Sequence, residues 1–192
     1  LLIVAYVSGR IDFYKEGKVI SIEDIYLSDY IGKKRINDLH LNNNILYIAT
    51  DFGIVVYDLA NQEVVDTYII GEEGTTIEVS QVAISSTQIV AATSNGLYAA
   101  DLANPNLVHF ENWTQTNINA TNAPIAGVVY LEDQLFATME STLWKLDTSD
   151  NSWMPVYGEE DWCIRSINKS QNQLLVASWK KNCDWGTKGR IV

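Results

Sequence analysis

Residues 180–189 combine side chains that could recognise an anionic sugar. Lys180, Lys181 and Lys188 accompany Trp185 in a chain whose formal net charge is −11. Lysine ammonium groups attract phosphate and carboxylate, and an indole ring can stack on the apolar face of a sugar. Two interpretations follow. Either these four residues contact a ligand or partner, or the segment is an irregular loop whose tryptophan packs back on the protein, which is the simpler reading.

The chain has two cysteines, and one of them, Cys183, lies in this segment. Cys163 begins an apolar segment upstream that we expect to open on the same side of the protein. A disulfide needs the two Cα atoms within about 7 Å of each other. Such a bond would hold the loop and would suit an oxidising exterior. The alternative is a pair of unbonded side chains, and the sequence leaves both open.

Catalytic and metal-binding patterns are not evident. The histidines, His40 and His109, stand alone, and there is no nucleophile elbow, zinc-protease motif or phosphate loop. The acidic clusters at residues 72–73 and 159–161 do not have the spacing of a calcium loop. We therefore expect no enzyme, no cofactor and no metal. These motifs do not test for a pair of carboxylates that distant loops bring together, the arrangement that cleaves glycosides.

The composition limits the partners. The chain has 13 basic and 24 acidic residues, whereas nucleic-acid surfaces need clustered Lys and Arg and anionic headgroups attract basic segments. We therefore expect no nucleic-acid partner. Apolar residues make up 47% of the chain, enough for a packed core. No apolar run reaches the roughly 18 residues of a membrane-spanning helix, so we expect no transmembrane segment in this stretch.

One pattern recurs along the chain at nearly even steps. Five apolar segments contain a small residue near their end, and aligning them on alanine gives positions 5, 49, 92, 137 and 177. The intervals are 44, 43, 45 and 40 residues. A chance apolar run would not recur in this way. The sequence therefore contains an internal repeat with a period of about 43 residues.

Each repeat is predicted to hold four short strands. The alanine motif is followed by a tight turn, with Gly9, Gly53 and Gly96 in the first three copies. Glycine supplies the positive φ that a short hairpin demands. One extended segment precedes the alanine motif and two follow it, and no segment shows a sustained helical period. A four-stranded unit of this length is typical of a propeller blade.

We therefore predict an all-β fold, a β-propeller of four-stranded antiparallel blades, as a single domain or fragment over residues 1–192. The blades would span residues 1–34, 35–78, 79–123, 124–161 and 162–192, the first and last being partial. This count favours an arc of four to five blades over a small closed ring in which the two ends share a blade. An open arc exposes apolar faces and strand edges, so we expect a partner or further chain to cover them.

Tryptophans offer further contacts for a sugar. Trp144 and Trp179 lie in or beside central strands, so we expect them to pack between blades. Trp113, Trp153 and Trp162 fall in outer strands or connections and are expected to stay more open.

The repeat texture resembles a known family. Residues 35–39 followed by residues 46–59 resemble a propeller repeat of the two-component-regulator type. More specific is their combination with segments on either side, namely residues 3–6, 9–12, 96–100 and 107–113. Over roughly residues 1–180 this order resembles the N-terminal propeller of the PorZ family, accessory proteins of type IX secretion in Gram-negative bacteria.

The resemblance implies a function without assigning a residue. PorZ-like proteins sit on the outer face of the outer membrane and assist a sortase that attaches cargo to anionic lipopolysaccharide. The resemblance therefore implies a non-enzymatic surface propeller whose partners are a sortase-like component, an anionic glycolipid, or both. The alternative is the periplasmic oligosaccharide-sensing propeller of a hybrid two-component regulator.

Overall fold

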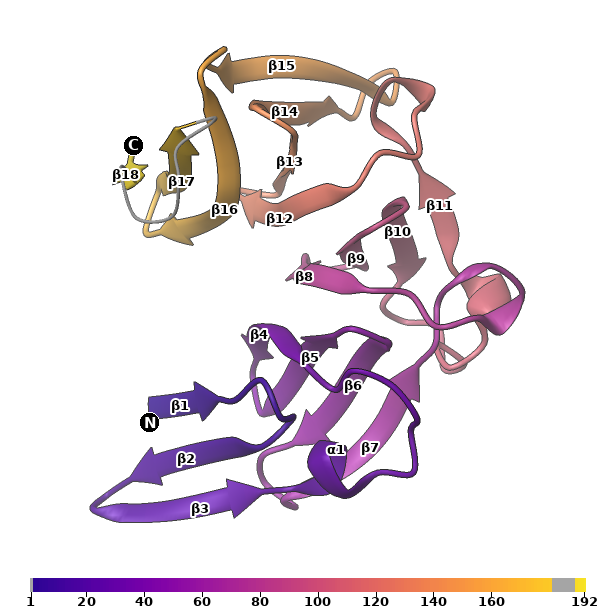
Figure 1. Cartoon of the computed structure of the whole chain (residues 1–192). Coiled ribbons are helices and arrows are strands. Elements are labelled where there is room, and N and C mark those ends of the chain that lie inside the picture. Colours follow the sequence, from indigo (N-terminus) through magenta and orange to yellow (C-terminus); the bar gives the residue numbers. More distant parts are fainter. Residues whose placement is uncertain (1, 181–188) are drawn as a thin grey trace.

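The computed structural model describes residues 2–180 and 189–192, which form antiparallel sheets arranged like the wedges of an open fan (Figure 1). This confirms the predicted all-β, partial-propeller fold. The first sheet contains β1 (Leu2–Ala5), β2 (Ile11–Lys15) and β3 (Lys18–Ile22). The second contains β4 (Ile36–Asn42), β5 (Ile45–Thr50), β6 (Gly53–Asp58) and β7 (Glu63–Tyr68).

The third sheet contains β8 (Val79–Ile84), β9 (Gln88–Thr93), β10 (Gly96–Asp101) and β11 (Thr114–Thr116). The fourth contains β12 (Ile125–Leu131), β13 (Gln134–Met139), β14 (Thr142–Asp147) and β15 (Ser152–Gly158). The fifth contains β16 (Trp162–Ser170), β17 (Gln173–Lys180) and β18 (Gly189–Ile191). Helical turns are short: α1 (Asp24–Leu27), η1 (Glu72–Gly74), η2 (Phe110–Asn112) and η3 (Ile118–Ala120).

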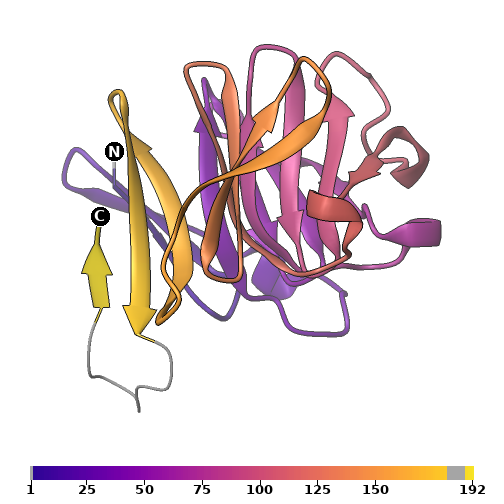
Figure 2. The same cartoon turned by 90° about the horizontal axis from the view of Figure 1, so that it is seen from above.

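Strands follow one another in chain order within every sheet, so each hairpin connects neighbours. The strands β4, β8, β12 and β16 lie innermost, where the sheets converge (Figures 1 and 2). Gly9 lies in the turn between β1 and β2, and Gly53 and Gly96 follow the matching turns as the first residues of β6 and β10. Their φ values are 92°, 145° and 98°, the positive φ predicted for these hairpins. A Cβ on Gly53 would collide with the Tyr68 carbonyl.

A β-bulge interrupts the start of each innermost strand and sets the register. The bulges fall between Ile36 and Asp38, Val79 and Gln81, Ile125 and Gly127, and Ile164 and Ser166. After the bulge, Ala49 pairs with Asp38 and Ala92 pairs with Gln81, but Thr138 pairs with Gly127. The alignment on Ala137 was therefore wrong by one residue, because the following turn begins one residue later in the fourth sheet.

Apolar side chains between adjacent sheets form the core. One cluster joins the first and second sheets, one the second and third, one the third and fourth, and one the fourth and fifth. Ala49 and Ala92 are fully buried, as expected where sheets crowd together. Each buried large side chain contributes about 1.5–3 kcal/mol, so the sheets hold one another in place.

The two sheets that border the opening of the fan each leave one face uncovered (Figure 1). On the first sheet Leu2, Tyr14 and Val19 lie in one row across the strands and are at least half exposed. On the fifth sheet Trp179 and Ile191 are 45% and 73% exposed. The assignment of residues 1–192 to one domain, with the blade limits given above, stays a prediction.

Candidate functional site

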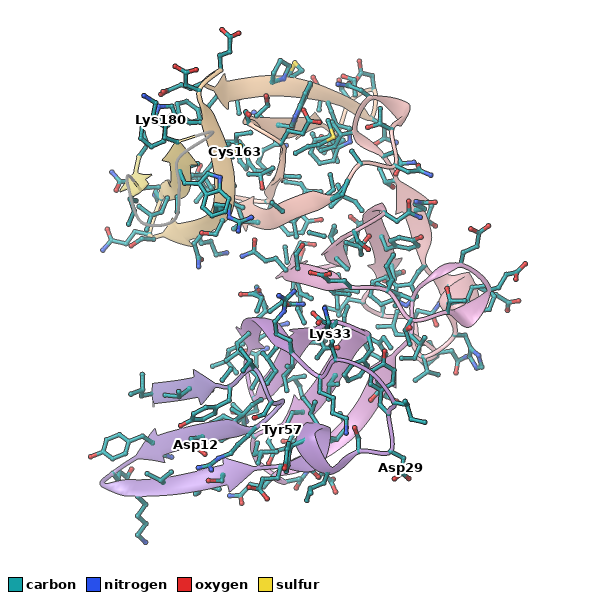
Figure 3. All side chains as sticks on the ribbon, in the orientation of Figure 1. Asp12, Asp29, Lys33, Tyr57, Cys163 and Lys180 are labelled. Atoms are coloured by element: carbon teal, nitrogen blue, oxygen red, sulfur yellow. The ribbon has the colours of Figure 1, made fainter. Side chains whose placement is uncertain are left out.

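The predicted contact segment begins at the end of β17. Lys180 is the last residue of that strand, is exposed and pairs with Trp162 at the start of β16. Figure 3 shows Lys180 and Cys163 at the same end of the fifth sheet. Lys181, Trp185 and Lys188 lie outside the described residues, so their role in ligand contact stays a prediction.

Cys163 lies where the sequence placed it. It is half-buried and pairs with Trp179, next to the strand end from which residue 181 continues. The start of β16 and the end of β17 thus lie side by side at the same end of the sheet. Cys183 lies outside the described residues, and the disulfide stays a prediction.

A cation–aromatic pair lies on the uncovered face of the fifth sheet, near this end. The Arg165 guanidinium lies over the Trp179 ring, with its carbon 3.6 Å from the ring centroid. Such a pair stabilises by about 0.5–1 kcal/mol at an exposed site. The pair borders a pocket of about 510 Å³ whose wall also includes Ala177 and Ile191. A cation and an aromatic ring together suit an anionic sugar or a peptide carboxylate.

The Arg165–Trp179 pair could not be predicted from the sequence, for two reasons. Trp179 was expected to pack between blades, which was wrong, because it is 45% exposed in the part of the chain that the structure describes. Arg165 is the extra residue of the bulge in β16, and a bulge breaks the two-residue alternation from which side-chain direction is read. The sequence did offer one signal for this pair, because basic residues lie next to a strand that contains tryptophan.

Two tryptophans expected to be open are buried. Trp113 and Trp153 are only 7% and 9% exposed, because each packs its ring against the preceding sheet. Trp144 is partly buried against the core between the third and fourth sheets, as expected. Trp162 is half-buried at the start of β16. The outer side of a sheet therefore carries aromatic rings that pack against the neighbouring sheet.

Polar side chains link the innermost strands across the fan. The Asp38 carboxylate accepts a hydrogen bond from the Val82 N–H at 3.5 Å, and burial raises its pKa to about 6. Gln81 accepts from the Val128 N–H and donates to the Ile167 carbonyl, each at 3.0 Å. These side chains satisfy backbone groups on the free edges of the next inner strands.

A small cavity of about 70 Å³ lies among these links, bordered by His40 and Lys169. Burial lowers the pKa of His40, and the Lys169 ammonium lowers it further. The cavity is far smaller than the roughly 300–1,000 Å³ of small-molecule sites. Its polar groups therefore serve packing and hydrogen bonding between sheets.

A charged cluster lies on the uncovered face of the first sheet (Figure 3). Asp12 accepts two hydrogen bonds from Arg10 at 2.9 Å, one from Ser21 at 2.7 Å and one from Tyr6 at 2.8 Å. Hydrogen bonds from Arg10 and then Ser21 lower the Asp12 pKa to about 2. The carboxylate is thus fully charged at neutral pH and fully engaged.

Within residues 2–180 and 189–192, no three His, Cys, Asp or Glu side chains lie close enough together to hold a metal. Glu72 and Glu73 are exposed in η1, and Glu159 and Glu160 are exposed beside β16, as expected of solvated charge. The same described residues include no helix of the length and hydropathy needed to span a membrane.

Comparison with protein families decides the assignment. Residues 1–114 match the model of the N-terminal β-propeller domain of PorZ, of the type IX secretion system. The chain belongs to the PorZ N-terminal propeller family. The predicted resemblance is thereby confirmed, and this chain is a propeller of the type IX secretion class. No curated protein sequence matches it.

Solved structures agree on the fold of this PorZ-family chain. PorZ of Porphyromonas gingivalis superposes with a TM-score of 0.75 at 18% identity, over 99% of this chain and 25% of that one. The extracellular domain of a putative hybrid two-component system of B. thetaiotaomicron gives 0.61 at 16% identity, over 92% and 25%. The WD40 propeller of Doa1 gives 0.65 at 13% identity, over 94% and 57%. The chain thus spans about a quarter of the first two.

Proposed function

We propose that the chain is a non-enzymatic surface propeller of a type IX secretion accessory protein. Its role is to scaffold a sortase-like component, to present anionic lipopolysaccharide, or both. Family membership over residues 1–114 is the observation that carries this proposal. PorZ of P. gingivalis is described as a bacterial surface component of that secretion system, which supports a location on the extracellular face of the outer membrane.

The chemistry of the fifth sheet supports a contact with anions. Arg165 and Lys180 bring positive charge to one uncovered end of a chain whose net charge is −11. Trp179 adds an exposed ring beside them. Lys181 and Lys188, which lie outside the described residues, are predicted from the sequence to belong to the same contact segment. Attraction between exposed opposite charges weakens with salt, so binding at this end should be strongest at low ionic strength.

The test is binding of the chain to purified anionic lipopolysaccharide. We expect the triple change Lys180→Ala, Lys181→Ala and Lys188→Ala to weaken binding roughly tenfold, because each exposed charge contributes up to about 1 kcal/mol. The matched control removes the exposed lysines Lys15, Lys18 and Lys33, on the β2–β3 hairpin and before β4. Equal affinity of the two triple variants for lipopolysaccharide would show that the contact segment does not bind it.

The second candidate is an oligosaccharide-sensing periplasmic propeller. The extracellular domain of the putative hybrid two-component system shares the fold, and this observation favours it. Family membership favours the secretion role. The full-length open reading frame separates the two, because a secretion domain would favour the first role and a membrane helix followed by a kinase would favour the second.

A further inference from the structure

A pocket of about 510 Å³ opens between the outer halves of the third and fourth sheets. Its floor is apolar and deeply buried, and includes Val90, Leu97, Leu135 and Trp153. The pocket lies far along the sheets from the inner-strand links, because it is lined by β9 to β11 and by β13 to β15. It lies within the size range of small-molecule sites.

The pocket exists because the third sheet carries small side chains where the second sheet carries large ones. The strand registers match Tyr47 to Val90, Val56 to Ala99, and Tyr68 to Thr116. Tyr47, Val56 and Tyr68 all belong to the cluster that fills the space between the second and third sheets. Val90, Ala99 and Thr116 all line the pocket. Reduced volume at three matching positions leaves the next interface open.

The ring missing from this interface is the one that would lie against Trp153. Trp113 and Trp153 both accompany an outer strand and face the preceding sheet. Tyr68 packs against Trp113 with ring centroids 5.9 Å apart. The residue that matches Tyr68 in the third sheet is Thr116, so Trp153 has no aromatic neighbour there. The pocket therefore has room for a six-membered ring beside Trp153.

The hydrogen bonding of the two tryptophans also differs. The Trp113 indole N–H donates to the Leu107 carbonyl at 2.9 Å. The Trp153 indole N–H is buried with no hydrogen-bond partner among the described residues. A buried donor without a partner costs about 1–3 kcal/mol, and an acceptor brought into the pocket would offset this cost.

The rim of the pocket sets the chemical class of ligand. Asp101, Asn112, Thr114 and Asn151 surround it with carboxylate, amide and hydroxyl groups, and no lining residue is Lys, Arg or His. Hydroxyl groups of a ligand find both donors and acceptors here. A phosphate or carboxylate finds no cation and meets the Asp101 carboxylate. An apolar floor with a tryptophan, below a rim of amides and hydroxyls, suits a neutral sugar ring.

We propose that the pocket between the third and fourth sheets binds a neutral saccharide residue, whose ring lies against Trp153 in the place that Tyr68 takes in the neighbouring interface. This site is separate from the fifth-sheet end and uses none of its lysines, so the two proposals fail independently.

The test is a nitrogen–proton NMR titration of the chain with glucose, galactose, mannose, N-acetylglucosamine and maltose, each to about 20 mM, because small ligands often bind weakly. A Trp153→Phe variant assigns the Trp153 indole signal. We expect at least one neutral sugar to move that signal saturably and to leave the Trp113 signal in place. No movement of the Trp153 signal with any of the five sugars overturns the proposal.

Two variants and one ligand localise the effect. Thr116→Tyr restores the ring of the neighbouring interface and should lower sugar affinity at least about tenfold, whereas Thr116→Ser should bind as the parent chain does. If Thr116→Tyr fails to fold, Ala99→Val fills less space and should still weaken binding. Unchanged affinity in the filled variants, or equal binding of glucose 6-phosphate and glucose, overturns the proposal.

Discussion

Asp38 and Gln81 occupy matching positions after the bulges of β4 and β8 and do the same work with different chemistry. Each accepts a hydrogen bond from a backbone N–H of the next inner strand. Gln81 does so as a neutral amide, whereas Asp38 holds a carboxylate out of water. Burial is the main reason why the Asp38 pKa rises to about 6 from its usual 3.8, and the Val82 and Leu39 amides oppose this rise.

Asp38 makes the stability depend on pH in a defined direction. Its raised pKa means that the folded state favours the proton, so its contribution is full below about pH 4 and is lost as pH rises through 6. Asp38→Asn should remove this dependence, worth up to about 3 kcal/mol between pH 4 and pH 7.5. Urea unfolding across that range measures it.

Asp29→Asn, on an exposed loop, is the matched control for loss of one negative charge. His40 is common to both variants, so its own titration cancels in the comparison. Parallel stability curves for Asp38→Asn and the parent chain would show that the Asp38 carboxylate is not held out of water.

At the level of residues, the sequence predicted the small buried alanines and the glycine turns, because volume and positive φ are intrinsic properties of a residue. It could not predict which tryptophans are covered. Trp113 directly precedes the outer strand β11 and Trp153 lies on the outer strand β15, yet the neighbouring sheet buries both. Trp179 lies on the second strand of its sheet, yet its face is open. Burial here depends on the neighbour, which a local pattern does not contain.

Among the strands, one long side chain at the inner edge links three sheets. Gln81 reaches past the fourth sheet to the fifth and bonds Ile167, a residue 86 positions along the chain. It passes Gly127, where a Cβ would lie 2.7 Å from the Gln81 amide oxygen and 2.6 Å from the Ile167 γ-methyl. Glycine at this point is required by close packing, because no positive φ is involved there.

Replacing either Gln81 or Gly127 should destabilise the chain. Gly127→Ala forces two close contacts and should cost about 1–3 kcal/mol, and Gln81→Ala leaves a buried N–H and a buried carbonyl without partners, at a similar cost. Since Gln81 and Gly127 share the same space, the double variant should cost less than the sum of the two. Urea unfolding of all three gives the coupling.

Gly189→Ala is the control, because a Cβ there would meet nothing nearer than the Ser178 carbonyl at 3.8 Å. Strict additivity of Gln81→Ala and Gly127→Ala, or a neutral Gly127→Ala, would contradict the bridge between the third and fifth sheets.

Strand existence and order were predictable from the 43-residue period, but the bulges were not. A bulge adds one residue to an inner strand without changing the composition of the repeat. The bulges before Asp38, Gln81 and Gly127 fix which residue pairs with each. The one-residue error at Ala137 has a different cause, because the turn after β13 begins one residue later than the turns after β5 and β9.

Across the whole molecule, two uncovered faces border the opening of the fan (Figure 1). They differ in chemistry. The first sheet presents Leu2 and Val19 beside the Asp12 cluster, and the fifth presents Trp179 under Arg165. Such exposed apolar area marks an interaction surface or a liability to associate.

Charging the first-sheet face should reduce binding of a hydrophobic dye without harming the fold. Leu2→Glu with Val19→Glu should lower dye fluorescence, and stability should change by less than about 0.5 kcal/mol per site because both residues are exposed. Tyr26→Glu with Leu27→Glu, equally exposed on α1, is the control and should lower it less. A larger drop for the control, or unfolding of the first pair, would contradict an uncovered first sheet.

We propose that this PorZ-family propeller works by holding a partner. The most direct measurement is equilibrium binding of the chain, at low salt, to a purified type IX secretion sortase and to anionic lipopolysaccharide. The account predicts saturable binding to at least one of them, weakened by the loss of Lys180, Lys181 and Lys188. Failure of a folded chain to bind either would contradict it.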